Sequence, residues 1–253
     1  MVSQKLPPGF NLVLLKSVES TNDEARRRAE DGAPDGTLIQ ARTQTGGRGR
    51  RGRSWESPVG NLYMSLILRP DCPVGAGLGL SFVSAIAMCD TIGSVMPPMV
   101  TVTAKWPNDI LINGRKVAGI LLESASGTDG KLRWLVVGVG VNIEQFPTNT
   151  QYPATSLYFE GPTNIEPAEV LGGFTRYFKR WFDIWKDEGF SPIRNAWLQR
   201  AAGLGEMLEI RLPDEMFVGR FLDIDESGSL LVELENGDIR SVTTGDVFPQ
   251  ELQ

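Results

Sequence analysis

The chain has 253 residues, of which 41% are hydrophobic and 22% are charged, so it can bury a substantial core. Its formal net charge of −6 argues against a general nucleic-acid-binding protein, for which a basic domain or face is expected. The complete absence of histidine excludes mechanisms that need an imidazole base, and it excludes zinc sites with histidine ligands.

The first part of the chain predicts three strands and two helices. The strands are expected at 11–18, 37–43 and 61–70, and a buried helix is expected at 76–95. Ser20 or Thr21 offers an N-cap for an exposed helix that follows the first strand. The alternation of apolar and polar residues in 61–70 predicts a half-buried strand that ends at a proline.

The middle of the chain predicts a hairpin and a continuing sheet. A strand at 100–106 is broken by Pro107, and 109–125 forms two strands around Asn113-Gly114, because both central positions of a type I′ turn need positive φ. Further elements are expected as a strand at 131–143, a long amphipathic helix at 167–189 and another helix that starts at Ser191-Pro192.

After Gly205 the pattern changes to short alternating strands separated by PDE, ESG and ENGD turns. This spacing predicts a small β-barrel of about fifty residues. The chain is therefore expected to have an α+β domain at 1–203 and a small β domain at 204–253.

The segment TGGRGRRGRSW at 45–55 has two interpretations. A flexible Arg-Gly tract that binds nucleic acid is one. An ordered loop that closes over a small anion is the other, because glycines let the backbone approach a ligand and guanidinium groups suit carboxylate or phosphate oxygens. The position of the segment between two apolar strands, with Trp55 directly after it, favours the ordered loop.

Two other stretches carry candidate residues whose ordinary roles are structural. Lys105 ends an apolar strand, where a lysine commonly reaches out to water, and Lys116 follows the hairpin turn. Asn108 and Asp109 suit either a magnesium site or a turn cap. Residues 20–22 supply small hydrogen-bonding groups at a strand-to-helix junction, where an N-cap alone would explain them.

Taken together, these stretches resemble the biotin–protein ligase (biotin–[acetyl-CoA-carboxylase] ligase) family. The stretches, in chain order, are EST-N (19–22), QTGGRGRRGRSW (44–55), KWPNDI (105–110), GRKVAGILLE (114–123) and GVGVNI (138–143). The resemblance implies a mixed β-sheet flanked by helices, of the class II synthetase-like type, with a C-terminal SH3-like barrel. It is to the monofunctional form, without an N-terminal DNA-binding domain, and implies no operator binding.

The resemblance implies that biotin and ATP react to give biotinoyl-5′-AMP, with Mg²⁺ as cofactor, and that biotin then passes to a lysine of a carrier protein. It assigns biotin binding to Ser20, Thr21, Asn22, Gln44, Arg48, Gly49, Arg50 and Lys105. It assigns ATP binding to Arg48, Arg50, Trp55, Asn108, Lys116 and Asn142. Lys105 and Arg50 are the expected catalytic residues, and Asp109 is a candidate metal ligand. Trp55 and Trp106 suit packing as well as a ligand wall.

The implied partner is the biotin carboxyl carrier domain of acetyl-CoA carboxylase or a related carboxylase, and the sequence leaves open whether the chain forms a homodimer. Only Cys72 and Cys89 occur, which fits a reducing cytoplasm. Residues 1–10 lack a signal-peptide pattern, and no uncharged apolar stretch reaches the roughly 18 residues of a membrane span. Two alternatives remain: a lipoate or octanoate ligase or transferase of the same fold, and an Arg-Gly nucleic-acid-binding module.

Overall fold

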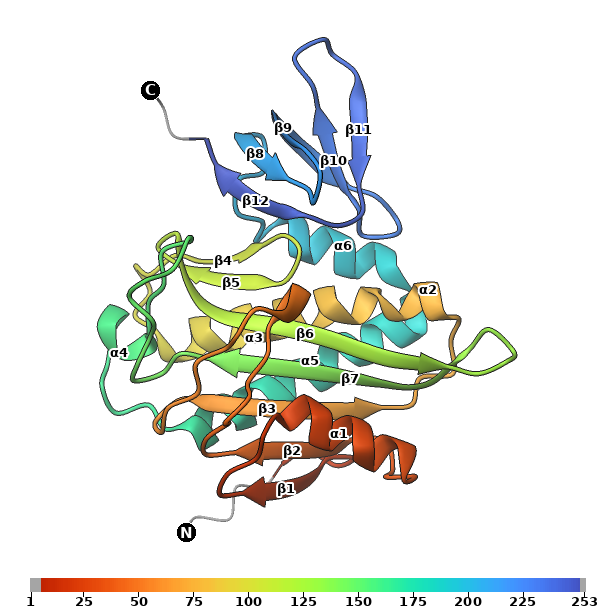
Figure 1. The fold of residues 1–253 in the computed structure, drawn as a ribbon, viewed down its shortest axis with the longest axis vertical. Helices are drawn as coiled ribbons and strands as arrows, with labels where there is room; N and C mark the ends of the chain where they lie inside the picture. The colour runs from red at the N-terminus through yellow and green to blue at the C-terminus, as the bar shows by residue number, and fades with distance from the viewer. Residues whose placement is uncertain (1–5, 251–253) are drawn as a thin grey trace.

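A seven-stranded mixed sheet lies at the centre of the computed structural model, which describes residues 6–250 (Figure 1). Its strand order is β1-β2-β3-β7-β6-β5-β4. The strands are β1 (Asn11–Leu15), β2 (Thr37–Ala41), β3 (Leu62–Leu68), β4 (Val102–Lys105), β5 (Asp109–Ile112), β6 (Arg115–Ser126) and β7 (Leu132–Val141). β1 and β2 are parallel, and all other neighbours are antiparallel, which confirms the predicted mixed sheet.

Helices cover both faces of this sheet. Helix α1 (Thr21–Glu30), which Ser20 caps, lies on one face, and α3 (Gly79–Val95) and α5 (Pro167–Glu188) lie on the other (Figure 1). The remaining helices are α2 (Val74–Gly77), α4 (Leu157–Glu160), α6 (Phe190–Leu198) and the 3₁₀ turn η1 (Arg50–Gly52).

The prediction of a half-buried strand at 61–70 is wrong, because all seven residues of β3 are buried. Met64 and Leu66 belong to the core that contains α3, whereas Ile67 packs with Ala25 and Ala29 of α1. The strand reads LYMSLIL, with Ser65 as its one small polar residue, and such a near-continuous apolar run is typical of a strand that is covered on both faces.

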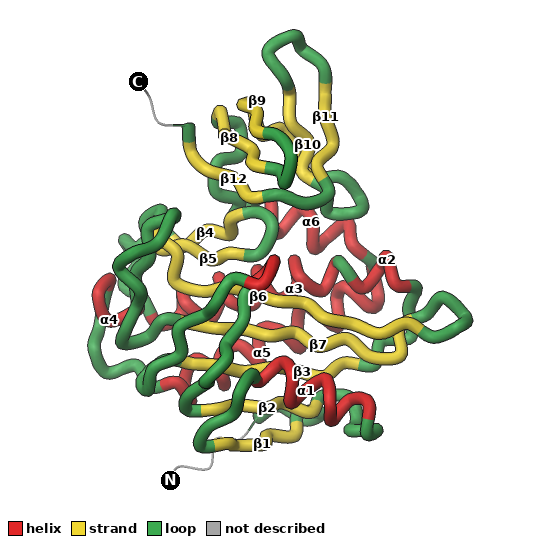
Figure 2. Tube along the Cα trace, in the orientation of Figure 1, coloured by secondary structure: helices red, strands yellow, loops and turns green. Residues whose placement is uncertain are grey.

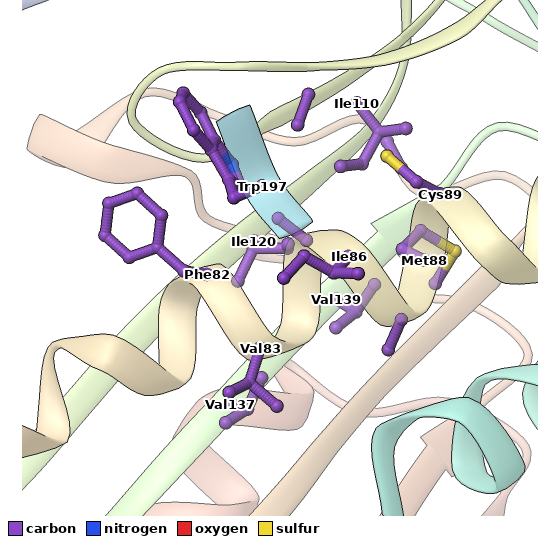
Figure 3. Close-up of a cluster of buried hydrophobic side chains, with 14 of the residues drawn as sticks. Phe82, Val83, Ile86, Met88, Cys89, Ile110, Ile120, Val137, Val139 and Trp197 are labelled. Atoms are coloured by element: carbon purple, nitrogen blue, oxygen red, sulfur yellow. The ribbon is translucent and has the colours of Figure 1, made fainter. Parts of the chain in front are cut away.

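Helix α3 is the centre of the main core. Figure 3 shows Phe82, Val83 and Ile86 of this helix against Ile120, Val137 and Val139 of the sheet, with Trp197 of α6 close by. The stretch Val74–Val95 is long and apolar enough to cross a membrane by length and composition, with a mean hydropathy of 1.6. Two thirds of its most apolar window (67%) is buried within the protein, as expected of a core helix.

The hairpin between β5 and β6 turns where the sequence predicts. Asn113 and Gly114 have φ angles of 48° and 76°, so both central residues adopt the left-handed conformation of a type I′ turn. The turn places Lys116 on β6 directly beside β5, within reach of Asp109.

The C-terminal part forms a second, antiparallel sheet with strand order β11-β10-β9-β8-β12 (Figure 2), which confirms the predicted small β module. Its strands are β8 (Met207–Arg211), β9 (Met216–Ile224), β10 (Leu230–Glu233), β11 (Ile239–Val242) and β12 (Asp246–Pro249). Trp106 joins the two sheets: it is 2% exposed and donates Nε1–H to the Gly228 carbonyl at 3.0 Å, so its role is packing. The predicted boundary between residues 203 and 204 stays a prediction.

Two predictions extend beyond the described residues. The lead-in at 1–10 that lacks a signal-peptide pattern includes residues 1–5, and the predicted β domain includes residues 251–253. Both stretches lie outside the part of the chain that the structure describes.

Candidate active site

A cavity of about 450 Å³ lies over β6 and β7, and the second sheet forms one of its edges. The chain between β2 and β3 crosses in front of β7 and β6 on its way to the second sheet (Figures 1 and 2). Every site residue predicted from the sequence lines this cavity: Ser20, Thr21, Asn22, Gln44, Arg48, Gly49, Arg50, Trp55, Lys105, Asn108, Asp109, Lys116 and Asn142.

One end of the cavity is formed by the first turn of α1. Ser20 is the N-cap, and its Oγ accepts from the Asp23 N–H at 3.4 Å. The backbone N–H and the hydroxyl of Thr21 both donate to Gln44 Oε1, at 2.8 and 3.1 Å. Gln44 Nε2 donates to Ser57 Oγ at 2.9 Å, so the Gln44 amide is fixed from both sides. The groups of Ser20, Thr21 and Gln44 that line this end are polar and uncharged.

Asn22 is oriented by two residues that the sequence reasoning missed. Ser65, fully buried in β3, lies 2.6 Å from Asn22 Oδ1 and can donate to it, and Asn22 Nδ2 donates to Glu123 at 2.8 Å. A serine in the middle of an apolar strand was the available signal for Ser65, because a buried hydroxyl needs a partner.

The G-x-G pattern of β7 makes room for two side chains of the cavity. A Cβ on Gly138 would lie 2.0 Å from Asn22 Oδ1, and one on Gly140 would lie 2.6 Å from the Trp55 indole. Within the described residues the Trp55 Nε1–H is buried and has no hydrogen-bond partner, which leaves a donor available at the cavity wall. Trp55 is therefore a wall of the cavity, whereas Trp106 is a packing residue.

The Arg-Gly segment is an ordered loop. The Gly49 N–H donates to the Arg53 carbonyl at 2.6 Å, and Arg48 and Ser54 form a β-bridge. Arg48 reaches the α1 end, where Asp23 lies at 2.5 Å and Glu123 at 3.4 Å. This order favours the anion-binding loop over the flexible tract.

The other arginines of the loop contact the second sheet. Arg50 reaches Thr244 Oγ1 at 3.3 Å, and burial lowers its pKa, although Asp246 opposes this shift. Arg53 forms an ion pair with Asp246 at 2.8 Å, and Arg51 lies 3.5 Å from the same carboxylate. Arg51 does not line the cavity.

The opposite end of the cavity holds a buried charge cluster. Asp109 lies 3.2 Å from the Lys105 ammonium and 2.5 Å from the Lys116 ammonium. Burial alone would raise the pKa of Asp109, but the two lysines outweigh it and the pKa is lowered. Burial lowers the pKa of Lys105, although Asp109 opposes this shift. With Arg50 nearby, this end carries an excess of positive charge suited to an anion.

Residues of two later segments also line the cavity without having been predicted from the sequence. They are Pro147, Asn149, Thr150, Gln151, Tyr152 and Ala154 after β7, and Asp246 and Phe248 of β12. The Tyr152 ring lies 4.7 Å from Lys105 Nζ, and the Lys105 ammonium also donates to the Val247 carbonyl at 3.3 Å. The polar, proline-containing stretch NIEQFPTNTQYP was the available signal for the first segment.

The protein provides few ligands for a metal ion. Among residues 6–250, no three His, Cys, Asp or Glu side chains gather as a metal site. Asp109 is the carboxylate at the cationic end, and both of its oxygens face lysine ammonium groups. These residues fit a magnesium ion that takes most of its ligands from phosphates and water, with at most one ligand from Asp109.

Comparisons with known proteins agree with this site. Residues 52–199 match the Biotin/lipoate A/B protein ligase family, and residues 203–248 match the Biotin protein ligase C terminal domain. The biotin--[acetyl-CoA-carboxylase] ligase of Paracoccus denitrificans is 42% identical over 87% of this chain and 92% of its own length. The bifunctional ligase/repressor BirA of Bacillus subtilis is 36% identical over 94% of this chain and 74% of its own length. The solved biotin protein ligase from Aquifex aeolicus in complex with biotin and ATP superposes with a TM-score of 0.78 at 28% identity, covering 94% of this chain and 97% of that chain.

Proposed function

This chain belongs to the biotin/lipoate A/B protein ligase family and attaches biotin to protein at the expense of ATP, and we propose that both half-reactions occur in the cavity over β6 and β7. One observation supports this most strongly. The cavity joins the uncharged hydrogen-bonding groups of Thr21 and Gln44, at one end, to a cationic end at Lys105 and Lys116. Biotin has the same polarity, with a neutral ureido ring at one end and a carboxylate at the other.

In the first half-reaction, the biotin carboxylate attacks the α-phosphate of ATP, pyrophosphate leaves, and biotinoyl-5′-AMP forms. Two anions must meet, so their repulsion has to be offset. Lys105, Lys116 and Arg50 supply positive charge at this end, and Asp109 holds the two lysines in place through its ion pairs. Magnesium on the phosphates would add to the neutralisation of charge.

In the second half-reaction, the amine of a carrier lysine attacks the acyl carbon, the new C–N bond forms, and AMP leaves. The structure offers no histidine for this step, and a mixed anhydride is activated enough to need mainly orientation and protection from water. We assign that protection to the 45–55 loop, with Arg50 retaining the intermediate.

The residue assignments of the proposal follow the two ends. Biotin is assigned to Ser20, Thr21, Asn22, Gln44, Arg48, Gly49, Arg50 and Lys105, and ATP to Arg48, Arg50, Trp55, Asn108, Lys116 and Asn142. Asn142 already donates one Nδ2–H to the Thr155 carbonyl at 3.0 Å, which leaves its second Nδ2–H and its Oδ1 for a nucleotide.

The acceptor in this proposal is a lysine of a biotin carboxyl carrier domain in a carboxylase. The division into domains 1–203 and 204–253 and a cytoplasmic location also belong to the proposal. Free Cys72 and Cys89 support the reducing location.

The decisive experiment measures pyrophosphate release that depends on biotin, followed by transfer of biotin to a carrier-domain lysine. Lipoate and octanoate serve as competing substrates. A thermal-shift comparison of biotin plus MgATP against an oligonucleotide adds a second readout, because only a ligand of the native state raises the midpoint. Pyrophosphate release with lipoate but not with biotin would refute the proposal, as would stabilisation by the oligonucleotide alone.

A further inference from the structure

The loop between β7 and α4 is closed at its base. After β7 the chain leaves at Ile143, passes through 145–155, and returns beside its starting point. The Leu157 N–H donates to the Asn142 carbonyl at 3.0 Å, and the Tyr158 N–H donates to the Ile143 carbonyl at 2.9 Å. Such a loop has few internal bonds, so its position depends on what holds its two ends.

Asn61 holds the first end. Its side chain is 3% exposed, and its Oδ1 accepts from three consecutive backbone N–H groups, those of Ile143, Glu144 and Gln145, at 2.9, 3.0 and 3.1 Å. Its Nδ2 donates to the Gln145 carbonyl at 2.8 Å. Loss of this side chain would leave several largely buried backbone groups without partners, which is costly.

Glu160 holds the second end. Its side chain is 4% exposed, with the Arg115 guanidinium at 2.6 Å and the Asn113 amide at 3.0 Å, both from the β5–β6 hairpin. The Thr155 hydroxyl donates to the same carboxylate at 2.5 Å. Glu160 thus fastens the end of the loop to the hairpin that carries Lys116.

The loop in turn contacts the cationic end of the cavity. The Tyr152 ring lies 4.7 Å from Lys105 Nζ. The Lys116 N–H donates to the Pro153 carbonyl at 2.8 Å, and the Thr155 N–H donates to the Lys116 carbonyl at 2.9 Å. Displacement of the loop would therefore disturb both lysines, whereas the hydrogen bonds of Thr21 and Gln44 at the α1 end are made to other parts of the chain.

We propose that Asn61 and Glu160 are positioning residues that hold the 145–155 loop across the Lys105–Lys116 end of the cavity and so set the affinity for ATP. Neither residue lines the cavity. The inference rests on the proposed function, because it places the phosphates of ATP beside the biotin carboxylate at the cationic end.

The test compares Glu160→Ala, Asn61→Ala and the pair Thr155→Val and Thr155→Ser in biotin-dependent ATP–pyrophosphate exchange. Thr155→Val is nearly isosteric and removes the hydroxyl that bonds Glu160, whereas Thr155→Ser retains it. Glu160→Ala and Asn61→Ala should each raise the KM for ATP at least about fivefold, the effect of losing one or two hydrogen bonds that position a site. The KM for biotin should rise less than the KM for ATP, because the groups assigned to the ureido ring of biotin lie at the α1 end of the cavity. Thr155→Val should raise the KM for ATP in the same direction as Glu160→Ala but by less. Thr155→Ser should have the KM for ATP of the parent.

Asp90→Asn is the matched control for general destabilisation. Asp90 is a partly buried carboxylate on α3, with Arg200 at 2.7 Å and Trp181 Nε1 at 2.8 Å. Hydrogen–deuterium exchange across 146–153 measures directly whether the loop is released. The exchange rate should rise in Glu160→Ala and not in Asp90→Asn.

The inference is overturned if hydrogen–deuterium exchange in the loop of Glu160→Ala rises while the KM for ATP stays at the parent value. It is equally overturned if hydrogen–deuterium exchange in the loop does not rise. It is also overturned if the KM for biotin rises as much as that for ATP. If the parent protein shows no biotin-dependent ATP–pyrophosphate exchange, the proposed function is refuted, and the inference with it.

Discussion

The Trp55 indole lies against the backbone of Gly140, so close that a Cβ on Gly140 would come within 2.6 Å of the indole. Gly119 lies directly across from Gly140 in the sheet, and its Cβ would come within 3.1 Å of the same ring. The Trp55 ring, which forms one wall of the cavity, therefore packs directly on the backbone of two glycines on neighbouring strands.

We expect Gly140→Ala to displace Trp55. Forcing an extra methyl group into this contact should lower the free energy of unfolding by about 1–3 kcal/mol and raise the KM for ATP. Urea unfolding and steady-state kinetics measure both effects. Gly93→Ala on α3 is the control: a Cβ there meets nothing within 4 Å, so stability should stay equal or rise by up to about 1 kcal/mol. Unchanged kinetics in Gly140→Ala would show that the indole position is unimportant for the nucleotide.

Arg50→Gly should permit some adenylation but release biotinoyl-AMP, because the loop then lacks the guanidinium assigned to hold the intermediate. Labelling of a non-cognate protein by the released anhydride measures the leak. Arg51→Gly is a control within the same loop: Arg51 does not line the cavity, and its φ of 55° suits glycine. Equal leakage from the two variants would contradict the role of Arg50.

Lys105→Ala should weaken biotin binding and lower kcat/KM for adenylation by about 10²–10³, the range seen when one preorganised electrostatic contact is removed. It also leaves Asp109 with a single lysine partner. Biotin titration and pyrophosphate release report the two effects. Lys131→Ala removes a lysine that pairs with Asp71 at 2.6 Å on the surface, and it should behave as the parent. Normal pyrophosphate release from Lys105→Ala would refute the assignment.

The Asp109 cluster should make stability depend on pH in the acid range. Because the two lysines hold the folded-state pKa of Asp109 below 3.8, the ionised carboxylate stabilises the fold above its unfolded pKa of about 3.9. This contribution is lost as pH falls through the folded-state pKa. Asp109→Asn should therefore cost about 3 kcal/mol near neutral pH, and its deficit relative to the parent should shrink as pH falls below about 3.9.

Urea unfolding of both proteins across this range measures the difference. Asp71→Asn alters an exposed ion pair, so its free energy of unfolding should differ little from that of the parent at any pH. A deficit in Asp109→Asn that stays constant with pH would mean that the carboxylate is not the group responsible.

The sequence predicted most elements because their signals are local, and it predicted the cavity residues because their motifs resemble those of a known family. Ser20 caps α1 through its own first turn, and the Asn113-Gly114 turn needs only its own two φ angles. The motif residues lie at strand ends, so a sheet that brings those ends together also gathers Lys105, Lys116 and Gln44.

The missed features depend on distant parts of the chain. Burial of the second face of β3 requires α1 to dock on it, and the apolar run of β3 does not identify which element does so. Asp246 and Phe248 reach the cavity only because the second sheet packs beside Trp106 and α6. Tyr152 sits in a loop whose position is set by Asn61, more than eighty residues earlier in the chain.

The walls of the cavity come from segments near residues 20, 50, 105, 120, 140, 150 and 246, which are spread across almost the whole chain. Contacts between such distant segments form late when a chain refolds, because each requires a large loop to close first. Catalysis should thus be the last property to recover after dilution from denaturant, later than helical circular dichroism and tryptophan burial. The rate at which activity returns would then report the rate at which the two sheets finally dock.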